Sequence, residues 1–443
     1  MASFGHFILA DPTSRGPLLH SLEIRVAVVS DAALDIFLRA LGYTVNLARL
    51  RLSSLEELPR ATAKTLCIGL AALKSVTDFA LRYPGGDYDR RLRRDPECTR
   101  EEYFPGLIRR LQSSLVSVTL VLPPEYDNEA CVIYKRNRDP IYLLSTQSAS
   151  LEHVALRGNI TVGGSKCIYS RVTRLSLPSD MGLLLLQPYI ACFPNVSTVD
   201  FLYNGIYRYP QDMTILDMWR VGLSLKEWHN VNTRNQVASG TWSRIQSLQG
   251  TIQDVYVYGI SCHTTRLHLL SIGGDHSDEL VMLSAILALT MPTALRLAVK
   301  VWSGRASLPM LPSTPASERL TSLELRINII LQKFQLDAYI DHVTNMLGSM
   351  RVLKSFQLEL RCLNTEIRSE VGLANNSSTS PINGTGINCA TPLDGVYGRC
   401  YLRDIMGHVD LYQMGRGKKQ CNRFIQIHAL SESFSTSRRV PDV

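Results

Sequence analysis

Three histidines and two aspartates lie close together in the sequence, and their side chains are among those that bind transition metals. They are His263, His268, Asp275, His276 and Asp278. His263 and His268 are an odd number of residues apart, so on a strand they would project from opposite faces. The two aspartates stand where a helix is expected to begin, a position that the helix dipole favours for acids. We therefore predict no metal site here, and we assign no catalytic, metal-binding or cofactor-binding residue and no cofactor to the chain.

A second candidate is the basic segment Gly415–Lys419, which invites comparison with a phosphate-binding loop. Such a loop has a glycine five residues before its Gly-Lys pair and a Ser or Thr after the lysine. Tyr412 and Lys419 occupy those positions, so we expect a solvated basic turn instead. The sequence contains no G-x-S-x-G, no H-E-x-x-H and no strand-associated G-x-G-x-x-G motif.

The densest basic region consists of Arg90, Arg91, Arg93, Arg94, Arg109 and Arg110. Acids surround it and nearly cancel its field: Asp87, Asp89, Asp95, Glu97, Glu101 and Glu102. We therefore favour a solvated insertion loop over a contact with an anion or a nucleic acid.

The composition is that of a folded protein. Apolar residues make up 45% of the chain and charged residues 19%, which excludes disorder over most of its length. The formal charge of +8 is mild for 443 residues, so it favours solubility over nucleic-acid binding. The ten cysteines form no C-x-x-C pair, which is typical of reduced thiols. We see no export signal and no apolar run of membrane-spanning length, and we expect a cytoplasmic or nuclear protein.

One pattern of apolar residues recurs along most of the chain. The segment Leu320–Leu325 shows it as L-x-x-L-x-L, whose last two leucines alternate with a polar residue as on a strand with one buried face. The pattern starts at Leu19, Leu47, Val76, Leu115, Leu151, Val172, Val196, Ile252, Leu267, Leu295, Leu320 and Leu353. Most of the spacings lie near the 20–29 residues of a leucine-rich repeat, and some are longer.

Two spacings are irregular. The gap between Val196 and Ile252 is long enough for one degenerate repeat, which we place near Leu223–Leu225. The step from Ile252 to Leu267 is too short for a strand and a helix, so one of these two matches is a hairpin or is misassigned.

Between the strands the period changes to that of a helix. Leu34, Phe37 and Leu41 follow the first strand on one helical face, with Ser30 or Asp31 as N-cap. The strand at Leu267 precedes a helix with Leu280, Leu283 and Leu287, capped by Asp275 and stopped near Pro292. The strand at Leu320 precedes a stripe that consists of Leu336, Tyr339, Ile340, Val343 and Leu347.

Strand–helix units in series predict an α/β fold: a leucine-rich-repeat-like solenoid, or horseshoe, with parallel strands on the concave face and helices outside. We expect an N-terminal leader at 1–18, the solenoid at 19–362, and a linker with a poorly ordered tail at 363–443, apart from a short strand around Phe424–Ile427. The alternative is an α/β enzyme with a doubly wound sheet, its ordinary buried strands being misread as repeats.

The strands resemble leucine-rich repeats of the ribonuclease-inhibitor-like class, as at Leu151–Leu156 and Leu320–Leu325. The long, irregular units are similar to those of fungal F-box proteins. In that family an N-terminal F-box recruits a cullin–RING ubiquitin ligase and the repeats bind its substrate. The resemblance implies a substrate-recognition module. Only the leader precedes the first strand, and it is too short for an F-box, so we expect that module to be lost or the chain to be a fragment.

The expected function is that of a non-catalytic protein–protein interaction scaffold, monomeric, with a protein partner and no contact with nucleic acid or membrane. The polar residues between the apolar ones would form its surface, among them Thr119, Ser176 and Asp254. The candidate partner surface consists of Glu324, Arg326, Gln357 and Glu359.

We predict that limited proteolysis cuts the chain first within 375–385. This segment is rich in Asn, Ser, Thr and Gly, and it has too few apolar side chains to offset the entropy of ordering it. Mass spectrometry of the first fragments would locate the cut. A first cut within Leu151–Phe201 that leaves 375–385 intact would contradict the prediction.

Overall fold

The computed structural model describes residues 1–25, 29–53, 58–82, 103–121, 139–157, 166–178, 185–202, 224–270, 276–301, 315, 317–329, 343, 345–348, 350, 352–362 and 424–431. The chain divides into two compact units. The first comprises Met1–Leu269 and Val281–Pro292, and the second comprises Leu270–Leu280 and Thr293–Val443. The stripe predicted from Leu336 lies mostly outside the described residues, as do 375–385 and Gly415–Lys419.

Strands that neighbour in sequence also neighbour in space in each unit, and every strand pair that the described register covers is parallel. The first unit contains β1 (Ser21–Arg25), β2 (Arg49–Ser53), β3 (Asp78–Arg82), β4 (Ser117–Val121), β5 (His153–Arg157), β6 (Arg174–Pro178), β7 (Thr198–Leu202), β8 (Ile245–Thr251) and most of β9 (Thr264–Leu270). The second contains β10 (Ala294–Val301), β11 (Ser322–Ile329), β12 (Ser355–Cys362) and β13 (Phe424–Ser431). The predicted α/β solenoid is confirmed, and this sequential order differs from that of a doubly wound sheet, where the order reverses.

One backbone arrangement recurs at the entry to the strands. The carbonyl oxygen of the residue directly before a strand accepts hydrogen bonds from two successive N–H groups at the entry to the next strand. Thr77 O, for example, accepts from Val116 N at 2.8 Å and from Ser117 N at 2.9 Å. The other carbonyls that do so are those of His20, Ala48, Val116, Glu152, Thr173 and Ser197 in the first unit, and of Thr293 and Thr321 in the second.

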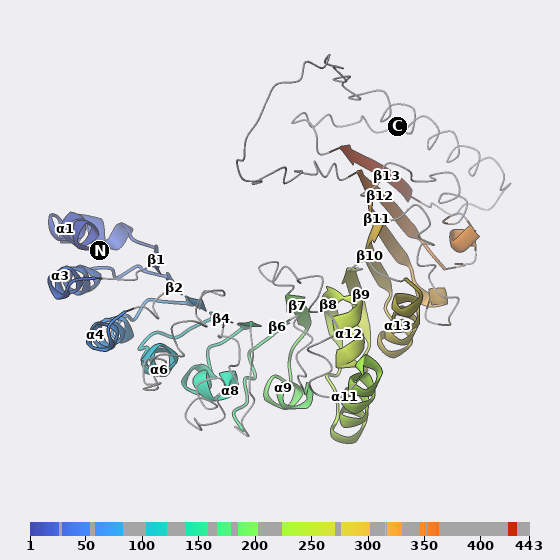
Figure 1. Cartoon of the computed structure of the whole chain (residues 1–443), viewed down its shortest axis with the longest axis horizontal. Coiled ribbons are helices and arrows are strands. Elements are labelled where there is room, and N and C mark those ends of the chain that lie inside the picture. Colours follow the sequence, from blue (N-terminus) through green and yellow to red (C-terminus); the bar gives the residue numbers. More distant parts are fainter. Residues whose placement is uncertain are drawn as a thin grey trace, which may run out of the picture. The chain divides into compact units, whose positions relative to one another are not determined.

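The helices follow one side of the first unit's strands. Figure 1 shows α3 (Asp31–Leu41), α4 (Arg60–Ala71), α6 (Tyr103–Arg110), α8 (Pro140–Leu143), α9 (Gln187–Cys192) and α11 (Leu225–Ser239) along the same side of β1 to β8. Ser30 caps α3 as predicted, because its Oγ accepts from Ala33 N. The remaining helices are α1 (Ala2–Leu9), α2 (Pro12–Arg15), α12 (Ile252–Tyr258) and α13 (His276–Thr290), with 3-10 turns η1 (Gly16–Leu18), η3 (Ser145–Gln147) and η4 (Ser317–Arg319).

The core lies between the strands and these helices. Most inward residues of the pattern are buried, with Leu22 half-buried. The residues that lead into seven strands are buried too: Leu47, Val76, Leu115, Leu151, Val172, Val196 and Leu320 have exposed fractions of 3% or less. Helix α13 confirms the helix predicted after Leu267, with Leu283 and Leu287 buried.

The strand predicted at Ile252–Val257 is wrong, because this segment is helix α12. Thr251 ends β8 and at once caps the helix, since its Oγ1 accepts from Asp254 N at 3.0 Å. The apolar residues whose spacing resembled a strand, Ile252, Val255 and Val257, therefore lie on a short helix. The degenerate repeat placed near Leu223–Leu225 is also wrong: Ser224 caps α11 there.

The missing repeat is β8. Ile245 and Leu248 fit the pattern, and Leu248 pairs with Val199 of β7. The third apolar position of this repeat is Gly250, where a Cβ atom would lie only 2.9 Å from the ring of Phe201. The Phe201 side chain fills the volume that a leucine occupies elsewhere, so the repeat has no apolar residue at that position.

Strand β9 exists where it was predicted, but its faces are shifted by one residue. Leu267 and Leu269 are buried, whereas Leu270, which the pattern places inward, is 41% exposed. The pattern leucines 267 and 270 are an odd number of residues apart, so a strand that contains both can bury only one of them.

Both terminal segments contain regular structure. The expected leader 1–18 forms α1, α2 and η1, and α1 contacts α3 closely enough that a Cβ on Gly5 would lie 2.7 Å from Ile36. Within 363–443, the strand predicted at Phe424–Ile427 is confirmed as β13, which pairs with β12.

We predict that Leu323→Ala lowers the free energy of unfolding by about 2–5 kcal/mol, because Leu323 is 1% exposed and its truncation leaves a cavity. Ser322→Ala, on the other face of the same strand, should change it by well under about 1 kcal/mol. Urea denaturation of both variants measures the difference. Equal destabilisation would mean that both faces of β11 are buried.

Candidate interaction surface

The candidate residues lie on the face of the sheet opposite the buried leucines. In β11, Leu323 and Leu325 are buried, and Glu324 and Arg326 alternate with them. We call the face that carries Glu324 and Arg326, with the corresponding alternate positions of the other strands, the polar face. Each unit has its own polar face, formed by β10, β11 and β12 in the second unit and by β1 through β8 in the first.

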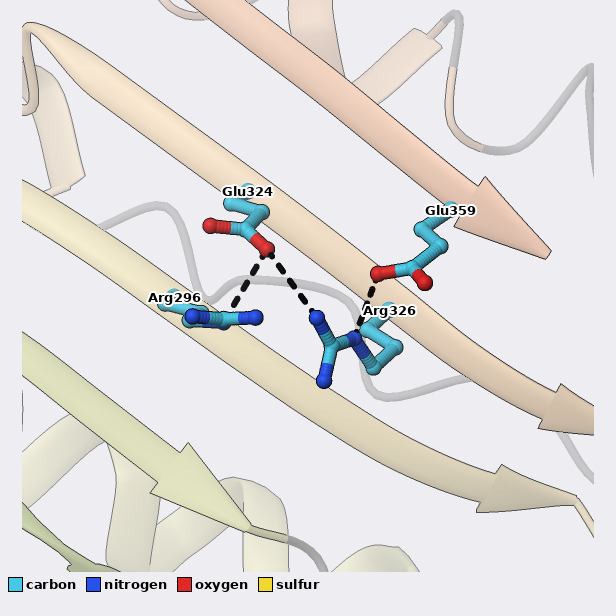
Figure 2. Close-up of polar contacts among 4 residues, drawn as sticks. All are labelled: Arg296, Glu324, Arg326 and Glu359. Atoms are coloured by element: carbon cyan, nitrogen blue, oxygen red, sulfur yellow. Dashed lines mark hydrogen bonds and ion pairs between the residues drawn. The ribbon is translucent and has the colours of Figure 1, made fainter. Parts of the chain in front are cut away.

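Charged side chains join three strands of the second unit. Arg296 Nε lies 3.0 Å from Glu324 Oε1, and Arg326 Nη2 lies 3.8 Å from the same oxygen. Arg326 Nε donates to Glu359 Oε2 at 2.5 Å (Figure 2). We call these four residues the ion-pair ladder. The sheet register explains it, because Arg296 pairs with Glu324 and Arg326 pairs with Glu359 across adjacent parallel strands.

The ladder is only partly accessible. The exposed side-chain fractions are 24% for Glu324 and 25% for Arg326, and Glu359 falls to 7%. Gln357 is half-buried beside Glu324 in the register. Strands about 4.8 Å apart bring long side chains against their neighbours, so these side chains cover one another. The candidate residues from the sequence, which are Glu324, Arg326, Gln357 and Glu359, thus lie together on one face. The sequence analysis missed Arg296, the fourth member of the ion-pair ladder.

The first unit carries isolated ion pairs on its polar face. Arg49 Nε lies 2.9 Å from Asp78 Oδ2, and the side chains of Arg49 and Asp78 are 51% and 32% exposed. Arg174 Nη2 lies 2.8 Å from Asp200 Oδ2, whose side chain is 7% exposed. Of the other polar residues that we expected on this surface, Thr119 is half-buried and Ser176 is buried.

The expected position of Asp254 on the polar face is wrong. It lies in α12 and is 3% exposed, with its carboxylate accepting from Thr251 Oγ1 at 2.5 Å. Its role is to fix the first turn of that helix, as acids at helix N-termini do.

The other chemical candidates lie elsewhere. Arg109 is at the end of α6, on the helical side, with its guanidinium 4.2 Å from the ring centroid of Tyr142. Within the described ranges, no group of three His, Cys, Asp or Glu residues has a geometry that could hold a metal ion. No helix in the described part of the chain is both long and apolar enough to cross a bilayer.

The buried cysteines are poor nucleophiles. Cys67, Cys192 and Cys262 are buried. Burial raises the pKa of Cys67 and of Cys262 to about 12 and that of Cys192 to about 11. Because the thiolate is the reactive form, these thiols stay protonated and unreactive near neutral pH.

No protein-family model matches the chain, and no curated protein matches it either.

We predict that Arg326→Leu lowers the free energy of unfolding by about 2–3 kcal/mol, because it removes the cation beside the nearly buried Glu359 carboxylate. Arg49→Leu is the matched control. It should change the free energy by less than about 1 kcal/mol, since the pair with Asp78 is exposed. Urea denaturation at low and high salt compares the two variants. If Arg326→Leu and Arg49→Leu lowered the free energy of unfolding equally at both salt concentrations, the prediction would be contradicted.

Proposed function

We propose that the chain is a non-catalytic protein–protein interaction scaffold and that a protein partner binds the polar face of its sheet. The observation that carries the proposal is the alignment of polar side chains by the strand register. The ion-pair ladder is its best-defined part, with contacts from β10 to β12.

The ladder supports this proposal because it holds its members in place before any partner arrives. Glu324 lies between two arginines, and Arg326 lies between two carboxylates. Long charged side chains normally lose about 0.5–1.5 kcal/mol each when an interface immobilises them. The ion pairs already supply part of that ordering, so the surface is suited to binding without large rearrangement.

The finer form of the proposal follows from the resemblance to fungal F-box proteins. In this form the scaffold is a monomeric cytoplasmic or nuclear protein that recognises a substrate for a cullin–RING ubiquitin ligase. The recurrence of L-x-x-L-x-L strands supports it, since in that family such repeats bind the substrate.

We predict that added bulk and negative charge on the polar face weaken partner binding. Proteins captured by the unchanged chain from an extract would be identified and purified, then titrated against Thr119→Glu and Gln357→Glu by calorimetry. Both positions are half-buried on the polar face, so a glutamate there should displace a docked partner and weaken binding by about tenfold or more.

The matched control is Ile68→Glu, which adds the same charge on α4, at a side chain that is 57% exposed. This variant should bind the partner as tightly as the unchanged chain does. Loss of binding in Ile68→Glu but in neither polar-face variant would overturn the proposal, because the partner would then bind the helices.

A further inference from the structure

Three strands of the first unit carry an arginine directly after the last apolar residue of the pattern. They are Arg25 in β1, Arg82 in β3 and Arg157 in β5. The register places Ser53 of β2 between Arg25 and Arg82. It places Val121 of β4 between Arg82 and Arg157. We call these five residues the arginine row, which lies at the carboxyl ends of five adjacent parallel strands.

The arginine row contains no carboxylate, unlike the equivalent position of the second unit. Arg326 also follows the last apolar residue of its pattern, but Glu359 stands beside it in the register and forms an ion pair. Among the residues that the structure describes, none forms an ion pair with Arg25, Arg82 or Arg157. The row therefore concentrates positive charge that the described part of the chain leaves uncompensated.

Two polar atoms of the row are buried without a partner. Ser53 is 8% exposed, and its Oγ makes no hydrogen bond within the described chain. Arg157 Nε is buried and likewise has no acceptor there. Burial lowers the pKa of Arg157, and the charge of Arg82 lowers it further. Buried polar atoms normally have hydrogen-bond partners. The Ser53 hydroxyl and Arg157 Nε can both donate, and a carboxylate is the acceptor that suits a guanidinium best.

We propose that the arginine row binds the carboxylates of an acidic segment of the protein partner. The proposal rests on the proposed function and adds the chemistry of what the scaffold binds. Arginine suits it, because its planar guanidinium can form two parallel hydrogen bonds to a carboxylate.

The spacing of the row fits an extended acidic chain. The arginines recur on every second strand, so their backbones lie about 10 Å apart at an inter-strand spacing of about 4.8 Å. Three residues of a polyproline II segment span about 9 Å and return the side chain to the same side. A segment with an acidic residue at every third position therefore matches the row.

One observation favours an acidic protein segment over a nucleic acid. The outward positions of β1 to β5 hold no Phe, Tyr or Trp on which bases could stack.

The test measures binding of fluorescein-labelled hexaglutamate to the full chain by fluorescence anisotropy. We expect saturable binding that weakens as salt is added. Arg82→Gln with Arg157→Gln should weaken it by about tenfold or more. The matched control is Arg39→Gln with Lys64→Gln, which removes the same charge from α3 and α4 and should leave binding unchanged. Arg82→Lys with Arg157→Lys keeps the charge and should retain part of the affinity, which separates lost contacts from lost folding.

Equal weakening by the row variant and the helix control would overturn the proposal, because binding would then follow net charge alone. Tighter binding of labelled hexathymidylate through Arg82 and Arg157 would also overturn it, in favour of a nucleic acid. If hexaglutamate does not bind while Thr119→Glu and Gln357→Glu still weaken partner binding, the acidic-segment proposal fails and the proposed function stands. If the partner binds Thr119→Glu and Gln357→Glu as tightly as the unchanged chain, the proposed function fails.

Discussion

The doubly accepting carbonyl that precedes β1 to β7, β10 and β11 fixes the alignment on which the rest of the structure depends. Each such oxygen holds two successive N–H groups of the next repeat, as Ala48 O holds Thr77 N and Asp78 N at 2.9 and 3.0 Å. Once these two bonds form, the register of the whole strand is set, because every later pair follows in parallel. A slip of one residue would move the buried leucines to the polar face.

The chemistry of the polar face follows from that alignment. The same register that places Glu359 beside Arg326 places Ser53 and Val121 beside Arg82. Arg326 therefore has a carboxylate beside it on the neighbouring strand, and Arg82 has none on either side. The difference lies in one residue of the neighbouring strand, so the electrostatic character of each part of the sheet is decided by pairs that are distant in sequence.

The sequence predicts the strands well where the apolar pattern is complete, because alternation reports burial directly. It fails at β8, where Gly250 leaves a space that Phe201 of another strand fills, and at α12, where helical spacing imitates the strand pattern. The arginine row had a visible signal, an arginine after the last apolar residue. Arg326 and Glu359 had the same signal, since each follows the last apolar residue of consecutive repeats, and the register shows that these positions pair. The carbonyl arrangement involves only backbone atoms, so the sequence contains no residue type from which it could be predicted.

The carbonyl arrangement also separates the length of a crossover from the alignment of the strands that it joins. The segments between β1 and β2, between β3 and β4 and between β5 and β6 run over 26–48, 83–116 and 158–173. They differ about twofold in length, yet each ends in the same pair of hydrogen bonds to the carbonyl before the preceding strand. Lengthening a loop adds little closure free energy, about 0.6 kcal/mol for each doubling. The length of a crossover can therefore differ from repeat to repeat while the sheet keeps its register.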